Sequence, residues 1–489
     1  MIYDEAYTVR YTDQFASIFL YNAPNNHVLH TLLVYFSRLI FGLNEFAVRL
    51  PSFSFGIASI IIAYWVLKKY FSNDIAMIVS GFIAFSDILI SFSVRARSYS
   101  MHVFFSLIIF YLIENAVNKR NKHGIILVGL VLGAALCTHF SLIYIYLASC
   151  AYGTVKILEL KFNSLLKTVK EIIILWGIPI IVSIIFYIPV ILATGFFVSQ
   201  PQDFSPEVFI STLKSRPISI ILLGIEKLIN NEAVHSLTYS EFFTGLGSYC
   251  MKVFIEEPAL GILPSPVFLV LFMVGIIKII KAIEYKDIFR LLIPFFICLI
   301  FIVLYPTRPS GRMWIFVFPL IYFVVGQGII NILDGIKTLF NNSKIIYYNK
   351  FIPAFFLIIV LLKLGTPIVN EGIEAFNTNY GGDHFTPEGV NIIKKELVGN
   401  NRIIVPWYFG PTLRFYATKF SNSISDEPYK MIRILYKEII PKKVIESTGT
   451  IFINSPGRIK PNFLDQLAEP QKFKIIYSDK HINVFKKSN

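Results

Sequence analysis

The sequence predicts an all-α polytopic membrane protein of about ten membrane-spanning helices, followed by a small C-terminal α/β domain. Hydrophobic residues make up 55% of the 489 residues and charged residues only 16%, whereas soluble domains carry roughly a quarter charged residues. Apolar runs of about 20 residues, the length that crosses a bilayer, recur as far as residue 369. Beyond residue 370 the pattern changes to short apolar stretches separated by turn residues.

Residues 1–50 are predicted to form an outer loop and a helix at the membrane surface. An acidic pair, Asp4 and Glu5, lies almost at the initiator methionine. Residues 25–47 are apolar but interrupted by His30 and Arg38, a pattern typical of an amphipathic helix in the plane of the interface. The alternative is a further span, which would place Asp4 in the cytoplasm.

Residues 51–369 are predicted to be the transmembrane helical core. Lys and Arg residues cluster in alternate connections between the apolar runs, and such residues stay in the cytoplasm. The N-terminus, the large loop 195–263 and the tail are therefore expected outside, with the multi-pass protein in the plasma membrane. The expected spans are 51–67, 75–93, 101–117, 124–138, 140–158, 171–194, 264–281, 288–305, 313–333 and 351–369.

The tail, residues 370–489, is predicted to be an extracytoplasmic α/β domain. Its stretches 401–417, 449–455 and 472–487 have the composition of short strands, and helix and turn signals separate them. The walls of an acceptor pocket are expected from this tail and from loop 195–263, although neither contains a diagnostic spacing.

Charge and cysteine content exclude several classes of protein. A formal net charge of +14 would indicate nucleic-acid binding in a soluble protein, but here the basic residues mark membrane topology, so no nucleic-acid partner is expected. The four cysteines have no paired spacing, so neither a disulfide framework nor a zinc site is indicated. No cofactor is expected, and a divalent metal is not indicated although it stays open.

The acidic pair is the first candidate for chemistry. A carboxylate such as Asp4, held at the membrane surface, can remove a proton from a hydroxyl as a general base. The alternative for Asp4 and Glu5 is a solvated, frayed N-terminus. Nothing in the local sequence chooses between the two.

Arginines at two span ends on the outer face form the second candidate. Arg95 and Arg97 lie in "SFSVRARSYS", and Arg308 and Arg312 lie in "YPTRPSGRMW". Arginine presents a planar fork of donors that suits a lipid phosphate. The alternative is that these side chains only anchor the helices at the interface.

Histidines and one aspartate complete the candidates. His27 and His30 are three residues apart and share a helix face, where a polar interfacial role is favoured over metal binding because no third ligand is near. His139 falls between two spans, as a boundary histidine. Asp87 lies within an apolar run, where a carboxylate is costly and faces a cavity or a partner, here one of the two nearby arginines.

Four stretches, in this order, resemble the membrane glycosyltransferases of the C superfamily (GT-C): "YDEAYT", "PNNHVLHTLL", "LIFGLNEFAVRLPSF" and "VRARSY". They are most similar to the family 39-like proteins, which are related to protein O-mannosyltransferases and to the lipid A aminoarabinose transferase. The resemblance is strongest over residues 3–100 and continues more weakly towards residue 370. The ordered set carries it, since no single motif is specific.

The resemblance implies a multi-span GT-C helical core with interfacial helices, an outer soluble domain and a polyprenyl-phosphate sugar as donor. The family's acidic pair maps onto Asp4 and Glu5. Two departures stand out: Arg95 occupies a position that is acidic in many relatives, and relatives carry one more span before the acidic pair, so we expect a span upstream of Met1. The remaining matched positions are Arg97 and Tyr99; Asn25, Asn26, His27 and His30; and Gly42, Arg49, Leu50, Pro51 and Ser52.

The resemblance also implies a reaction. A hexosyl- or pentosyltransferase of this kind moves the sugar to a hydroxyl of a lipid, glycan or protein acceptor, with Asp4 as general base, Glu5 orienting it, and inversion at the anomeric carbon. No metal is required, because arginines match the leaving monophosphate. The donor phosphate is expected at Arg97, Tyr99, Arg95, Arg308 and Arg312, and positioning roles are expected for Asn26, His27, His30, Asp87 and His139.

Two other functions stay open at this point. One is a transporter or flippase of a lipid-linked sugar, which is disfavoured because the polar groups cluster at one face and no repeated halves are apparent. The other is a non-catalytic membrane subunit of a glycan assembly machine.

Overall fold

The structure is a computed structural model of the 489-residue chain, and it describes most of the first 194 residues together with later helices and strands. Contacts divide the chain into two compact units. One unit comprises Met1–Asp13, Val34–Val48 and Leu362–Asn489, and the other comprises Gln14–Leu33 and Arg49–Leu361. The described residues are 5, 8, 9, 11, 12, 15–19, 27–118, 121–159, 165–194, 265–281, 315–339, 403–406, 432–435, 451–454, 473–478 and 483–487.

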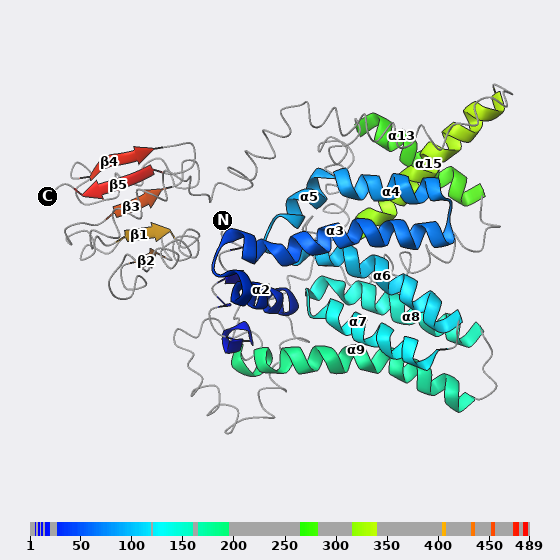
Figure 1. Cartoon of the computed structure of the whole chain (residues 1–489), viewed down its shortest axis with the longest axis horizontal. Helices are drawn as coiled ribbons and strands as arrows, with labels where there is room; N and C mark the ends of the chain where they lie inside the picture. Colours follow the sequence, from blue (N-terminus) through cyan, green and yellow to red (C-terminus); the bar gives the residue numbers. More distant parts are fainter. Residues whose placement is uncertain are drawn as a thin grey trace, which may run out of the picture. The chain divides into compact units, whose positions relative to one another are not determined.

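Helices form the described part of the chain up to residue 339 (Figure 1). Among the described residues, four segments are long and apolar enough to cross a membrane, namely Glu45–Tyr70, Tyr99–Asn118, Leu165–Ile188 and Ile315–Gly335. The chain is therefore a helical integral membrane protein, as predicted, and the expected spans 288–305 and 351–369 lie outside the described residues. The elements are η1 (Phe15–Phe19), α2 (Val28–Phe41), α3 (Glu45–Tyr70), α4 (Asn73–Phe85), α5 (Asp87–Ser93), α6 (Tyr99–Asn118), α7 (Lys122–Leu136), η2 (Phe140–Leu142), α8 (Ile143–Glu159), α9 (Leu165–Thr194), α13 (Ser265–Lys281) and α15 (Phe318–Leu339).

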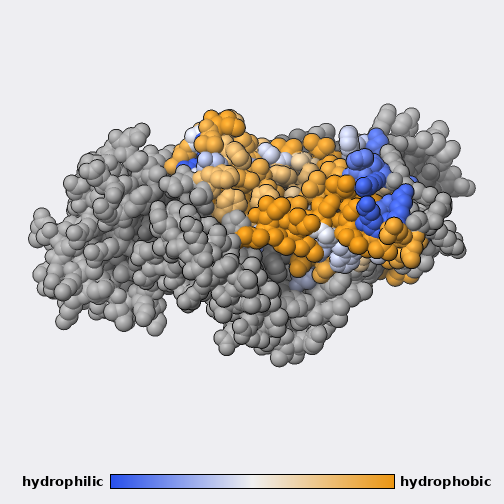
Figure 2. All heavy atoms as spheres, turned by 90° about the horizontal axis from the view of Figure 1, so that it is seen from below, coloured by the Kyte–Doolittle hydropathy of each residue, from blue (hydrophilic) through white to orange (hydrophobic). Residues whose placement is uncertain are grey.

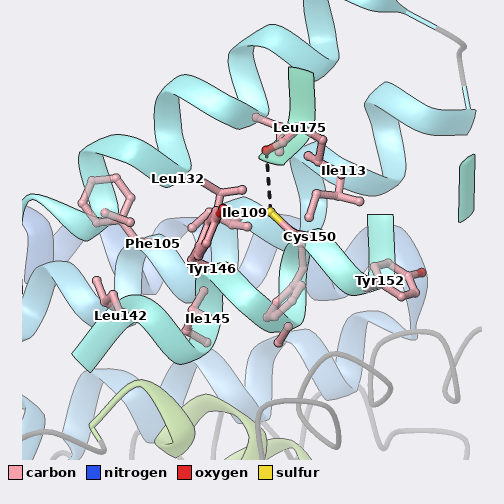
Figure 3. Packing of buried hydrophobic residues seen from close by; sticks show 14 of the residues in the cluster. Phe105, Ile109, Ile113, Leu132, Leu142, Ile145, Tyr146, Cys150, Tyr152 and Leu175 are labelled. Atoms are coloured by element: carbon pink, nitrogen blue, oxygen red, sulfur yellow. Dashed lines mark hydrogen bonds between the residues drawn. The ribbon is translucent and has the colours of Figure 1, made fainter. Parts of the chain in front are cut away.

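Helices α6, α7, α8 and α9 share one hydrophobic core (Figure 3). Glycines allow α7 to lie close along α9, because a Cβ added at Gly129 would stand 2.8 Å from Cβ of Ile178 and one added at Gly133 would stand 2.5 Å from Cβ of Val182. The thiol of Cys150 on α8 points to the carbonyl oxygen of Leu175 on α9, 3.6 Å away. Between helices in lipid there is no hydrophobic driving force, so van der Waals packing holds them together, and small residues allow the close backbone approach that this packing needs.

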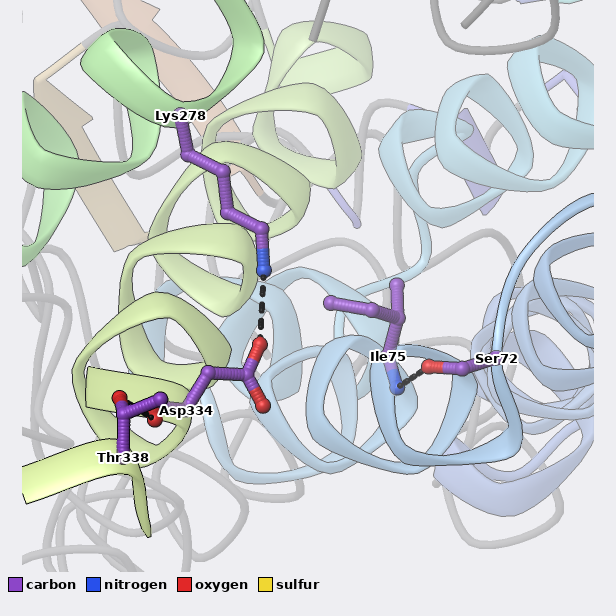
Figure 4. A network of polar contacts seen from close by, with 5 residues as sticks. All are labelled: Ser72, Ile75, Lys278, Asp334 and Thr338. Carbon is purple, nitrogen blue, oxygen red and sulfur yellow. Dashed lines mark hydrogen bonds and ion pairs between the residues drawn. The ribbon is translucent and has the colours of Figure 1, made fainter. Parts of the chain in front are cut away.

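Helices α13 and α15 approach even more closely. A Cβ at Gly275 would stand 1.9 Å from the carbonyl oxygen of Val324, and one at Gly328 would stand 1.9 Å from that of Leu271. At one end of this pair the ammonium of Lys278 lies 3.4 Å from the carboxylate of Asp334 (Figure 4). The carboxylate is 65% exposed, so the ion pair adds little and the glycine contact accounts for the crossing.

The single helix predicted over 75–93 is wrong, because the chain breaks there into α4 and α5. Ser86 has an extended backbone (φ −68°, ψ 118°) and is at once the C-cap of α4 and the N-cap of α5. Its hydroxyl accepts from the amide of Leu89 at 3.5 Å and from the hydroxyl of Tyr322 at 2.7 Å. Serine satisfies free helix-end groups, and Tyr322 on the distant α15 anchors the break.

The described helices present an apolar surface, continuous over much of the face in Figure 2, with hydrophilic residues gathered towards one end. On α9 the exposed side chains include Ile173, Ile181 and Ile185, which is the expected surface against lipid tails. Lys167 and Lys170 stand exposed at the first turns of the same helix, so one end of the span is basic. Which side of the membrane this end faces stays a prediction.

Five short strands in the tail form a mixed sheet: β1 (Ile403–Pro406), β2 (Ile432–Leu435), β3 (Ile451–Asn454), β4 (Phe473–Ser478) and β5 (Asn483–Lys487). The strand order is β2-β1-β3-β5-β4, with β1 parallel to β2 and β3, and β5 antiparallel to β3 and β4. Four strands fall within the predicted stretches and β2 falls outside them. Because the segments between the strands lie outside the described residues, the α/β domain and the domain boundaries stay predictions.

Candidate functional site

Polar side chains are buried where the start of α2, the connection between α5 and α6 and the end of α7 meet. The amide of Leu29 donates to the carbonyl oxygen of Cys137 at 2.9 Å, which joins α2 to the end of α7 (Figure 1). Burying polar groups is costly unless they are hydrogen-bonded, so this cluster serves either specificity of packing or function. Its members are His27, Ser52, Arg97, Ser98, His102, Thr138 and His139, all at most 4% exposed.

Arg97 is the centre of this cluster. It lies in the tight connection between α5 and α6, where its amide donates to the carbonyl oxygen of Arg95 at 2.7 Å. It is 1% exposed and belongs to the largest fully buried side chains among the described residues. Burying a guanidinium costs on the order of several kcal/mol unless anionic groups or hydrogen-bond acceptors accompany it. The binding of an anion by Arg97 stays a prediction.

Ser52 fixes the backbone of Arg97. Its hydroxyl donates to the carbonyl oxygen of Arg97 at 2.8 Å, and Nε2 of His30 lies 2.8 Å from the same hydroxyl. Since the serine proton is used on the carbonyl, Nε2 of His30 donates to Ser52. Ser100 in turn donates to the carbonyl oxygen of Ser52 at 2.8 Å. Helix α3 thus holds the backbone of Arg97 through Ser52, and α2 supports that serine through His30.

His27 is held in one tautomer by acceptors. Its Nδ1 lies 3.0 Å from the carbonyl oxygen of Thr138 and 2.6 Å from Oγ of Ser98, whose hydroxyl donates to the same carbonyl at 3.1 Å. A carbonyl oxygen only accepts, so Nδ1 carries the proton. Burial lowers the pKa of His27 well below its usual value, and the charge of Arg97 lowers it further. Nε2 is therefore an unprotonated acceptor.

That Nε2 of His27 is buried and has no hydrogen-bond partner among the residues that the structure describes. An unsatisfied buried acceptor costs free energy. A hydroxyl group of a ligand would supply the missing donor. The ring therefore has the chemistry of a recognition group for a hydroxyl.

His102, His139 and Tyr99 pack around His27. Ring centroids lie 4.9 Å apart for His27 and His139, 5.2 Å for His102 and His139, and 5.6 Å for His27 and Tyr99. Burial, followed by the charge of Arg97, lowers the pKa of His139 to about 3. Within the described ranges no group of three His, Cys, Asp or Glu side chains is placed to hold a metal ion.

The structure brings together several residues that the sequence singled out. His27, Arg97 and His139 belong to the buried cluster, Tyr99 packs against its histidines, and His30 joins it through Ser52. Their catalytic or binding roles stay predictions.

Other predicted residues lie elsewhere. The guanidinium of Arg95 stands over the ring of Phe92 at 5.4 Å, and Asp87 is the first residue of α5 rather than part of a continuous span. Glu5 is helical and 1% exposed, in the other compact unit. Asp4, Asn26, Arg308 and Arg312 lie outside the described residues.

Sequence reasoning missed Ser98, His102 and Thr138 as members of the cluster. Ser98 and His102 are four apart, a spacing that places both on one helix face, and Nε2 of His102 lies 3.3 Å from Oγ of Ser98. That spacing was the available signal. Thr138 takes part through its backbone carbonyl, so its residue type carried no signal.

Comparison with known protein families gives a match for part of the chain. Residues 26–191 match the family of dolichyl-phosphate-mannose-protein mannosyltransferases. The resemblance predicted from the sequence is thereby confirmed for this part of the chain, which contains the whole buried cluster. No curated protein sequence matches the chain.

Solved structures offer distant likenesses to the fold. The oligosaccharyltransferase of Archaeoglobus fulgidus, in complex with Zn and sulfate, has a TM-score of 0.47 at 10% sequence identity. The match covers 99% of this chain and 69% of the oligosaccharyltransferase chain. Two structures of ArnT from Cupriavidus metallidurans each have a TM-score of 0.38 at 12% sequence identity. The match to the apo state covers 98% of this chain and 92% of the ArnT chain. The match to the state bound to undecaprenyl phosphate covers 99% of this chain and 93% of the ArnT chain.

Proposed function

We propose that the chain is an integral-membrane glycosyltransferase that moves a sugar from a polyprenyl-phosphate donor to a hydroxyl acceptor at the outer face of the membrane. The observation that carries the proposal is the buried Arg97, whose backbone is held by Ser52 and whose charge helps to keep His27 and His139 neutral. The family match over residues 26–191 supports the same donor chemistry, because the family is named for a polyprenyl-phosphate sugar.

Charge and burial make Arg97 suited to a leaving phosphate. Two opposite charges attract each other several times more strongly in a partly dehydrated site than in water. A guanidinium also matches the geometry of phosphate oxygens. When the bond between the anomeric carbon and the phosphate oxygen breaks, negative charge grows on that oxygen. A preorganised guanidinium stabilises this charge at no reorganisation cost. Neutral His27 and His139 add no charge that would repel Arg97 or compete for the phosphate.

The acceptor side of the reaction rests on the acidic pair. Asp4 takes the proton of the acceptor hydroxyl as its oxygen attacks the anomeric carbon from the face opposite the phosphate. The product has inverted configuration, and the polyprenyl phosphate leaves as the monophosphate. Nε2 of His27, as a buried acceptor, binds a hydroxyl of the sugar and so fixes the orientation of the donor.

The test uses purified protein in lipid nanodiscs with a synthetic polyprenyl-phosphate sugar, and measures the release of free polyprenyl phosphate. Arg97→Lys keeps the charge but loses the planar fork, so we expect a raised KM for the donor. Lys68→Arg, an exchange of the same two residue types near the end of α3, is the matched control. Asp4→Asn should abolish transfer while donor binding persists.

Two results would contradict the proposal. One is a wild-type protein that releases no polyprenyl phosphate from any of a panel of sugar donors. The other is an Arg97→Lys protein whose donor KM equals that of the control at equal protein level.

A further inference from the structure

The segment that carries the acidic pair has one buried face. Glu5, Thr8, Val9 and Thr12 are all at most 4% exposed, and their spacing is that of neighbours on one side of a helix. Glu5, Thr8 and Val9 have helical backbone and Thr12 lies in a turn. We call these four residues the acidic segment. The described part of this segment is therefore packed rather than frayed.

The acidic segment ends in a turn whose carbonyl groups need donors. The amide of Thr12 donates to the carbonyl oxygen of Val9 at 2.9 Å, and the hydroxyl of Thr12 donates to the same oxygen at 2.7 Å. The amide of Tyr11 donates to the carbonyl oxygen of Thr8 at 3.2 Å. Carbonyl groups at the end of a helix carry partial negative charge and favour a cation.

Arg38 on α2 supplies that cation. Its Nη1 donates to the carbonyl oxygen of Val9 at 3.2 Å and also to the hydroxyl oxygen of Thr12. One guanidinium nitrogen thus contacts both groups that close the turn. Basic side chains that bond the last carbonyls of a helix stabilise its end.

The position of Arg38 is unusual for its surroundings. The next residues on α2, Leu39 and Ile40, are 65% and 74% exposed, so the end of the helix is apolar and faces outwards. A charged residue within such an apolar surface is costly unless it has a specific contact. The hydrogen bonds to Val9 and Thr12 are specific contacts of this kind.

We propose that Arg38 is a positioning residue, which fixes the end of the acidic segment and thereby the direction of the Glu5 carboxylate. The inference rests on the proposed function, in which the acidic pair acts on the acceptor hydroxyl. Arg38 touches neither substrate in this account. It acts by holding the turn at the end of the helical segment that carries Glu5.

Three variants test the proposal in the full-length protein. Arg38→Met removes the donor, and Thr12→Val removes its side-chain acceptor while keeping the shape. Ser37→Ala is the matched control, because Ser37 is the neighbour of Arg38 and its buried hydroxyl has no hydrogen-bond partner in the described part of the chain. Removing such a group is close to neutral for stability.

Two readouts are measured for each variant. Hydrogen–deuterium exchange of the peptide containing residues 5–12 reports on the turn without any activity. The kinetic readout separates kcat from the donor KM. We expect faster exchange and a kcat lower by about 10- to 100-fold in Arg38→Met and Thr12→Val, as for a reacting group displaced by about 1 Å, with the donor KM unchanged and Ser37→Ala like wild type.

The outcomes separate this inference from the proposed function. Unchanged hydrogen–deuterium exchange in both Arg38→Met and Thr12→Val overturns the inference that Arg38 holds the turn, whatever the transfer activity. Faster exchange with an unchanged kcat overturns the positioning role, because the contact of Arg38 with the turn would then affect structure but not the reaction. If wild type transfers no sugar, the proposed function fails, and the exchange data still decide whether Arg38 holds the acidic segment.

Discussion

His139 should make the folded protein sensitive to mild acid. Its ring is 4% exposed, and burial together with the charge of Arg97 lowers its pKa to about 3, whereas a histidine in the unfolded chain titrates near pH 6.5. The folded state therefore keeps this ring neutral at pH 5 while the unfolded state binds a proton. Since the folded pKa lies below the unfolded value, stability is present above about pH 6.5 and falls as the pH drops below it.

The magnitude follows from the pH interval. Between about pH 6.5 and pH 5 the unfolded chain gains one proton that the folded chain does not bind, over about 1.5 pH units at about 1.4 kcal/mol each. The loss from His139 at pH 5 is therefore about 2 kcal/mol. His27 adds to the loss in the same direction, because its pKa is lowered too.

The assay compares wild type with His139→Asn by detergent-induced unfolding, followed by tryptophan fluorescence at pH 7 and pH 5. Nδ1 of His139 accepts from the amide of Ser141 at 3.1 Å, and the oxygen of an asparagine can accept from the same amide without titrating. We expect the variant to lose about 2 kcal/mol less than wild type on acidification. An equal loss in both proteins would refute the reasoning.

Three further outcomes are expected. Ser52→Ala should raise the donor KM and lower the free energy of unfolding by about 1–3 kcal/mol, because the carbonyl oxygen of Arg97 loses a buried donor; transfer kinetics and detergent unfolding measure both. Gly275→Ala should lower the free energy of unfolding by about 1–3 kcal/mol or more, since the new Cβ would stand 1.9 Å from a backbone oxygen of α15. Gly335→Ala, where a new Cβ would meet open space, should not lower it, and an equal effect of the two substitutions would contradict the close crossing of α13 and α15. His27→Phe should lower kcat/KM for the donor by about tenfold through one lost hydrogen bond, and should leave the kinetics unchanged if Nε2 binds no hydroxyl.

The helical membrane fold was predictable because it depends on composition and on the length of apolar runs. A 20-residue apolar stretch has few alternatives in a bilayer, where each backbone group must be satisfied within its own helix. The break at Ser86 was harder to predict. The run 75–93 is mainly apolar, with four serines and one aspartate, and only one of the serines, Ser86, marks the break. The bond from Tyr322, 236 residues away, supports the break there.

The candidate site was predictable only in part. Arg97, His27 and Tyr99 stood out by residue type and by the ordered resemblance, and they lie together. Ser52 appeared only as one letter of a matched stretch, although it bridges His30 and the backbone of Arg97. The tautomer of His27 depends on the carbonyl oxygen of Thr138, and a backbone carbonyl has no signature in the residue type.

By itself, the sequence determined that the chain enters a membrane as helices and which residue types are available for phosphate and hydroxyl chemistry, because hydrophobicity and side-chain chemistry are local properties. The packing of distant segments decided which of these residues meet. It brought two neutral histidines under the influence of the charge of one buried arginine and set Arg38 against the end of the acidic segment. Such contacts arise from long-range geometry, and single residues do not encode that geometry.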